Sequence, residues 1–143
     1  MPYTESKIQA IGDGRLSGTT ADFAATQVAL CRVNQPCDLF SVGALILIAP
    51  TAESILTVTR RVLPGSDTGA TAVAIITIPS LTAIGKIVYK ECHILTVKLP
   101  VKLNAGDELV FTMAGTTLTW RPWFEAYPRP EVKANNSDFL LSA

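Results

Sequence analysis

Residues 95–113 read LTVKLPVKLNAGDELVFTM and carry the clearest structural pattern in the chain. Apolar side chains alternate with polar ones or with Pro100 in the first half, and the alternation resumes over 109–113. A period of two is typical of a β-strand with one buried face and one solvated face. The four residues NAGD at 104–107 separate the two halves, so we predict a β-hairpin. Pro100 cannot donate a ladder hydrogen bond, which places the first strand at a sheet edge or breaks it there.

Apolar runs separated by turn residues recur along the rest of the chain. Residues 55–62 also fit a helical stripe, but their Thr and Val content favours a strand. Short strands with turn signals about every ten residues indicate a sandwich or barrel rather than βαβ units. We therefore predict an all-β fold, an antiparallel, jelly-roll-like β-sandwich of about eight strands. The candidate strands are 23–33, 39–49, 55–62, 72–78, 85–91, 95–103, 109–113, 118–120 and 123–127.

The predicted sandwich core comprises residues 23–128 of a single domain that spans 1–143. Residues 1–22 are rich in Gly, Ser, Thr and Asp, which predicts an N-terminal arm. Residues 129–143 are predicted to form a C-terminal tail, which ends in an apolar Phe139-Leu140-Leu141 triplet. A segment this short cannot fold alone, so we expect the triplet to dock on another surface.

The composition limits the classes of partner. Hydrophobic residues make up 48% of the 143 residues and charged ones 17%, which suggests that other chains cover part of the surface. The net charge is zero without a basic stripe, which argues against nucleic-acid binding. The longest apolar run, 42–50, is too short to span a membrane. The N-terminus lacks a signal-peptide pattern and the number of cysteines is odd, so we expect a reducing cytoplasm.

The search for reactive groups predicts no catalytic residue, cofactor or metal, and we expect that the chain is not an enzyme. His93 adjoins Cys92, and neighbours on a strand point to opposite faces, so they cannot easily form a nucleophile–base pair. Cys31, Cys37, Cys92 and His93 lack the spacing of a zinc site. Buried free thiols are the favoured interpretation, with a Cys31–Cys37 disulfide as the alternative. The aspartates are scattered through turns, unlike the carboxylate pair of a glycosidase.

Four aromatic residues cluster near the end of the last strands: Trp120, Trp123, Phe124 and Tyr127. The favoured interpretation places Trp120 and Phe124 in the core and Trp123 and Tyr127 at its rim. A platform for stacking sugars or for contacting a protein stays open as the second interpretation.

Several segments resemble small accessory virion structural proteins of tailed bacteriophages. They are 63–69 (LPGSDTG), 85–90 (GKIVYK), 103–111 (LNAGDELVF), 127–131 (YPRPE) and 134–138 (ANNSD). The resemblance implies a protein that decorates or cements the capsid, or a small head or tail appendage. It further implies a homo-oligomer, often a trimer, that is assembled in the host cytoplasm and resides in the virion.

The leading functional expectation is a non-enzymatic virion component, most simply a capsid decoration or cement protein that binds the major capsid protein and stabilises the shell. Other virion proteins are the alternative partners. The alternative function is a carbohydrate- or receptor-binding β-sandwich module of a phage appendage. The candidate interface residues are Trp123, Tyr127, Arg129, Phe139, Leu140 and Leu141.

Overall fold

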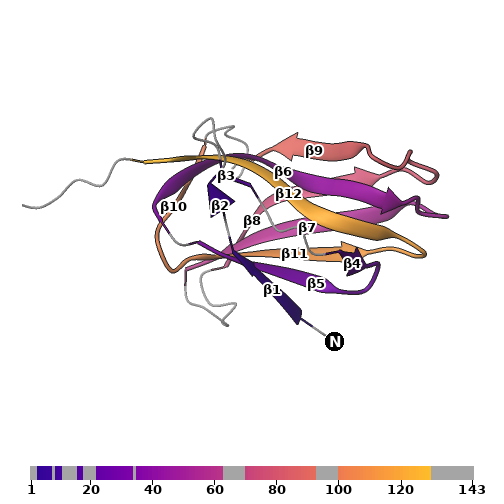
Figure 1. The fold of residues 1–143 in the computed structure, drawn as a ribbon, viewed down its shortest axis with the longest axis horizontal. Coiled ribbons are helices and arrows are strands. Elements are labelled where there is room, and N and C mark those ends of the chain that lie inside the picture. Colours follow the sequence, from indigo (N-terminus) through magenta and orange to yellow (C-terminus); the bar gives the residue numbers. More distant parts are fainter. Residues whose placement is uncertain are drawn as a thin grey trace, which may run out of the picture.

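The chain folds into two β-sheets that face each other (Figure 1). The structure is a computed structural model that describes residues 3–7, 9–10, 16–17, 22–33, 35–62, 70–92 and 100–129, with side chains from residue 22 onward. Among these residues, the first sheet has the order β1 (Tyr3–Lys7), β5 (Val28–Arg32), β11 (Glu108–Ala114), β7 (Ser54–Arg61) and β8 (Thr71–Ile78). The second has the order β10 (Val101–Leu103), β6 (Cys37–Ile48), β12 (Thr119–Pro128), β3 (Leu16–Ser17) and β2 (Gln9–Ala10). In addition, β4 (Phe23–Ala24) pairs with β12, and β9 (Ile87–Glu91) pairs with β6.

The predicted all-β sandwich is confirmed. The described strand pairs are antiparallel except β1, which runs parallel to β5. The chain passes repeatedly from one sheet to the other, as it does between β5 and β6 and between β11 and β12. Such crossings are typical of a jelly-roll-like sandwich. Residues 55–62 lie almost entirely in β7, so the strand interpretation of this segment is right and the helical one is wrong.

The core lies between the sheets and is built on aromatic side chains from both. Trp120 of β12 is fully buried and lies against Phe23, with 5.4 Å between the ring centroids. The Trp120 indole N–H donates to the Ala24 carbonyl at 3.0 Å, so its polar atom is satisfied inside the core. Phe111 enters from the first sheet and Phe124 from the second, and both are buried. Trp120 and Phe124 are therefore core residues, as the sequence predicted.

The predicted hairpin over 95–113 is wrong. Residues 101–103 form β10, which pairs with β6 in the second sheet, whereas β11 pairs with β5 and β7 in the first. Residues 95–99 lie outside the described residues. Alternation identifies a strand with one buried face, but two strands in facing sheets share the same core and show the same alternation. The connection at 104–107 is therefore an arch between the sheets. Pro100 immediately precedes β10, which is an edge strand as predicted.

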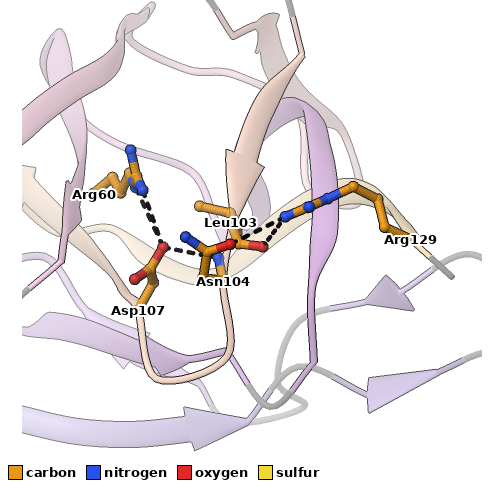
Figure 2. A network of polar contacts seen from close by, with 5 residues as sticks. All are labelled: Arg60, Leu103, Asn104, Asp107 and Arg129. Carbon is orange, nitrogen blue, oxygen red and sulfur yellow. Dashed lines mark hydrogen bonds and ion pairs between the residues drawn. The ribbon is translucent and has the colours of Figure 1, made fainter. Parts of the chain in front are cut away.

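A buried carboxylate holds this arch (Figure 2). Asp107 is only 5% exposed, and its Oδ2 accepts the Asn104 N–H at 2.9 Å. The same oxygen accepts Nε and Nη2 of Arg60, both at 3.3 Å. The arch turns through Gly106, whose φ of 94° favours glycine. One carboxylate thus joins the arch to β7 of the first sheet.

Part of the predicted N-terminal arm belongs to the sheets. Residues 3–7 add β1 to the edge of the first sheet, and residues 9–10 and 16–17 form the small β2–β3 pair beside β12. Arg129, the first residue of the predicted tail, donates its backbone N–H to the Pro36 carbonyl at 3.0 Å. The rest of the tail, residues 130–143, lies outside the described residues.

We expect Asp107→Ala to lower the free energy of unfolding by about 2–3 kcal/mol, because the Asn104 N–H and the Arg60 guanidinium lose a buried, charged acceptor. Urea denaturation measures this change. Asp22→Ala is the matched control, since Asp22 forms a surface ion pair with Arg121 and its side chain is 54% exposed. The control should cost less than about 1 kcal/mol. Equal losses in both variants would contradict the role of Asp107.

Candidate interaction surfaces

Four aromatic side chains lie together on the outer face of the second sheet, away from the core. They are Phe40 of β6, Tyr89 of β9, and Trp123 and Tyr127 of β12, and we call this group the aromatic face. Tyr89 and Trp123 lie with ring centroids 5.3 Å apart at 49°, and Phe40 and Tyr127 at 5.3 Å and 86°. Tyr89 is 59% exposed, and Phe40 and Tyr127 are each 40% exposed. The aromatic face therefore consists of two ring pairs that remain accessible to solvent.

Gly43 allows the first ring pair to form. Both Tyr89 and Trp123 pair with Gly43 across adjacent strands, so the two rings meet above a residue without a side chain. A Cβ at Gly43 would collide with the Val88 carbonyl oxygen and would lie 2.7 Å from Tyr89 Cα. The close approach of β9 to β6 therefore requires glycine at this position.

A row with two carboxylates separates the ring pairs. Glu125 of β12 and Glu91 of β9 both pair with Ser41 of β6. Strand alternation puts both glutamates on the outer side, since Phe124 and Ala126 beside Glu125 are buried. The Tyr127 hydroxyl donates to Glu125 Oε2 at 3.0 Å, which fixes the orientation of that carboxylate.

The structure brings two of the predicted interface residues together. Trp123 and Tyr127 both belong to the aromatic face, whereas Arg129 lies beyond the end of β12, and Phe139, Leu140 and Leu141 lie outside the described residues. Sequence reasoning missed Phe40 and Tyr89. Nothing local to either residue identifies it, because the contact depends on how β6 and β9 align with β12.

A second surface lies at the end of the sandwich where β6 terminates. Residues 79–86 connect β8 to β9, and we call them the apolar loop. Leu81 and Ile84 are 77% and 68% exposed, and Ile48 at the end of β6 is 51% exposed. Single exposed apolar residues are common, but three at one end of a domain form a patch that suits contact with another molecule.

Hydrogen bonds hold the apolar loop in one conformation. They are Leu81 N–H to Pro50 O at 2.8 Å, Thr82 Oγ1 to Pro79 O at 2.6 Å, Gly85 N–H to Ile46 O at 2.7 Å and Lys86 N–H to Ala83 O at 3.2 Å. Leu81 has a φ of 60°, in the left-handed region that costs a non-glycine residue about 1–2 kcal/mol. The loop therefore holds an exposed leucine in a strained conformation, a feature that is concentrated at functional sites.

Arg129 anchors the opposite end of the sandwich (Figure 2). Its Nη2 donates to the Leu103 carbonyl at 2.6 Å and lies 3.4 Å from Asn104 Oδ1. Its Nε lies 3.1 Å from Asp38 Oδ1, but the pair lacks hydrogen-bond geometry, so this contact is an ion pair only. Arg129, the last described residue, is therefore fixed beside the arch.

The three cysteines are buried free thiols, as predicted, and the alternative Cys31–Cys37 disulfide is not formed. Burial raises the pKa of Cys31 and of Cys92 to about 12. Burial also raises the pKa of Cys37 to about 11, with a smaller opposing effect of the Arg129 charge. A protonated, buried thiol is a poor nucleophile and a poor metal ligand. His93 lies outside the described residues.

Among the described residues, no group of three or more His, Cys, Asp or Glu side chains could hold a metal ion. The described residues also contain no helix that is long and apolar enough to cross a membrane.

Comparisons with known proteins identify no family. No family model and no curated protein matches the chain. The crystal structure of a beta-glucosidase from Paenibacillus barengoltzii aligns with a TM-score of 0.39 and 10% sequence identity. The alignment covers 87% of this chain but 11% of the glucosidase chain. A likeness this distant carries no argument about function.

We expect Gly43→Ala to lower the free energy of unfolding by roughly 2 kcal/mol or more, because the new methyl group collides with backbone atoms of β9. Urea denaturation measures the loss, and near-ultraviolet circular dichroism reports on the Tyr89–Trp123 pair. Gly106→Ala is the control, since its Cβ would meet open space and only the positive φ is penalised, by about 1 kcal/mol. A loss of less than about 1 kcal/mol in Gly43→Ala, or an equal change of the near-ultraviolet signal in the two variants, would disprove the close packing of β9 on β6.

The raised thiol pKa values predict a loss of stability in alkali. Unfolded thiols ionise near pH 9, while the folded Cys31 thiol ionises near 12, so rising pH between these values favours the unfolded state. The free energy of unfolding should fall across this window, and Cys31→Ala should make the fall shallower. Denaturation at several pH values measures both slopes. Parallel slopes for the two proteins would rule out a contribution from Cys31.

Proposed function

We propose that this chain is a non-enzymatic structural component of a phage virion, a decoration or cement protein that binds the major capsid protein. One observation carries the proposal: the apolar loop displays Leu81 and Ile84 to solvent on a hydrogen-bonded, strained backbone. A fold that only needed stability would gain nothing from this arrangement. Burying two such side chains in a partner contributes about 3 kcal/mol or more, without an ordering cost for the loop.

The arrangement of the two ends supports a role between other chains. The twelve residues of β6 span about 36 Å from the arch, where Arg129 is anchored, to the apolar loop. The fourteen residues 130–143 therefore start at the end of the domain opposite to the apolar loop. A cement protein needs contacts at separated points of this kind, because it must connect neighbouring capsid subunits.

The resemblance to small phage virion proteins supports the identity of the partner. Two of its segments now have a structural setting, since 85–90 covers the end of the apolar loop and the start of β9, and 103–111 covers the arch and the first half of β11. The buried thiols, with pKa values raised to about 11 and 12, support a role without nucleophilic chemistry. The proposal includes a homo-oligomer, most simply a trimer, and location in the virion.

The test adds the purified chain to capsids that lack it and measures occupancy by quantitative gel densitometry. Leu81→Ser/Ile84→Ser should weaken binding roughly a hundredfold, which corresponds to about 3 kcal/mol. Ile75→Ser is the matched control, because Ile75 is 55% exposed on the outer face of the first sheet and should leave binding unchanged. Wild-type protein that does not bind capsids, or equal binding of both variants, would contradict the proposal.

A truncated chain tests the tail separately. Ending the protein after Arg129 keeps the contacts to Pro36 and Leu103 and removes the triplet Phe139-Leu140-Leu141. We expect the melting temperature to stay the same and capsid occupancy to fall at least tenfold. Unchanged occupancy would exclude the tail from the interface, and sedimentation analysis of the same pair would show whether the tail also holds the oligomer together.

A further inference from the structure

We propose that the aromatic face is a binding site for a neutral oligosaccharide, which stacks its sugar rings on the Tyr89–Trp123 and Phe40–Tyr127 pairs. This site is separate from the contacts proposed at the two ends of the sandwich and does not depend on them. The proposal rests on one arrangement: the paired residues Glu125, Ser41 and Glu91 form a row between two exposed ring pairs.

The distribution of aromatic residues shows that the aromatic face is not a by-product of the core. The aromatic side chains that the structure describes divide into two groups of four. The core group is Phe23, Phe111, Trp120 and Phe124, and all are at most 3% exposed. The other four, Phe40, Tyr89, Trp123 and Tyr127, all lie on one sheet face. Scattered surface aromatics would need no explanation, but their collection on one face requires one.

Pyranose rings match this surface chemically. A pyranose presents C–H groups on its flat faces and hydroxyl groups around its rim. The face of an aromatic ring carries partial negative charge and attracts such C–H groups, while the apolar contact removes both surfaces from water. The exposed rings of Tyr89 and Tyr127 therefore offer stacking surfaces, and the hydroxyl groups at the rim of the sugar need acceptors nearby.

The carboxylate row supplies those acceptors and argues against a protein partner. Ionised carboxylates accept several hydrogen bonds each, and charge-assisted bonds are about twice as strong as neutral ones. The bond from Tyr127 to Glu125 holds one of these groups in a defined orientation. The central part of a protein–protein interface is depleted of charged residues, whereas two glutamates stand in the middle of the aromatic face.

The charge of the surface selects neutral sugars. Arg121, on the same side of β12, is engaged by Asp22 with Nε 2.6 Å from Oδ1. Lys90 of β9 turns toward the other sheet and donates to the Ile75 carbonyl at 3.1 Å. Glu91 and Glu125 place two carboxylates at the centre of the aromatic face, so an acidic sugar would have to bring a further carboxylate close to them, which Coulomb repulsion disfavours.

The spacing of the ring pairs sets the size of the ligand. Trp123 and Tyr127 are four residues apart on one strand, which corresponds to about 13 Å. One sugar ring cannot contact both pairs, so affinity should rise from monosaccharide to oligosaccharide. Because the rings lie on paired strands, they lose little freedom when the ligand binds.

The test is isothermal titration calorimetry of the full chain with cellohexaose, xylohexaose, mannohexaose and chitohexaose, and with an oligogalacturonate of equal length as the acidic probe. We expect at least one neutral hexasaccharide to bind with a Kd below about 10 mM and the acidic probe to bind at least tenfold more weakly. Tyr127→Ala and Trp123→Ala should each weaken the neutral ligand at least tenfold. Leu81→Ser is the control at the far end and should leave sugar binding unchanged.

Trp123 also packs against Tyr89, so its replacement could change stability as well as binding. The sugar affinity of Trp123→Ala is therefore compared with the stability of the same variant in urea denaturation. Tyr127→Ala tests the site independently, since Tyr127 lies near the end of β12 and its loss should leave the fold intact.

The proposal is overturned if no neutral probe binds, if the acidic probe binds best, or if Tyr127→Ala binds as well as wild type. Capsid binding that is lost in Tyr127→Ala without any sugar binding would show a protein interface instead and would also overturn it. Loss of capsid binding in Leu81→Ser/Ile84→Ser bears only on the virion role.

Discussion

The pairing of β6 with β12 is the constraint on which the rest of the structure depends. The two strands run antiparallel from Cys37 opposite Pro128 to Ile48 opposite Thr119. Their inner sides carry Leu39, Ile46, Trp120 and Phe124 into the core, so the ladder sets where the first sheet must pack. Because a strand has only two faces, the same register also decides which residues reach solvent. The core and the aromatic face are therefore two consequences of one alignment.

The second sheet departs from regular strand pairing at a few positions. The register shifts between Glu125 and Ala126, so β6 carries one extra residue there, and two residues, Phe40 and Ser41, separate the fully buried Leu39 and Val42. Pro122 lies between the short pairings of β12 with β4 and β3, a position that tolerates a missing N–H. At the open edge between the sheets, Lys90 donates to the Ile75 carbonyl of β8. Such a contact protects an edge strand from pairing with another chain.

The sequence predicted the positions of the strands better than it predicted which strands pair with one another. Alternation and β-branched runs located most of the strands, and the burial of Trp120 and Phe124 follows from the same period of two. The pattern around 104–107 predicts a hairpin where the structure has an arch, because alternation does not reveal whether two strands pair or face each other across a core. Trp123 and Tyr127 could be selected as surface residues from one strand alone. Phe40 and Tyr89 could not, since their place beside those rings depends on long-range register and on the absence of a side chain at Gly43.

The sandwich places its three candidate interaction surfaces at different positions along β6 and β12. The apolar loop and the Arg129 anchor lie at opposite ends of β6, while the aromatic face occupies the outer side of the strands between them. Sites that share no residues and lie well apart usually contribute independently to binding. The apolar loop meets this condition, whereas the aromatic face adjoins the Arg129 anchor, because Tyr127 pairs with Asp38 and Asp38 Oδ1 lies 3.1 Å from Arg129 Nε. Because all three surfaces are attached to β6 and β12 or to the connections at their ends, the register of these two strands fixes the positions of the surfaces relative to one another.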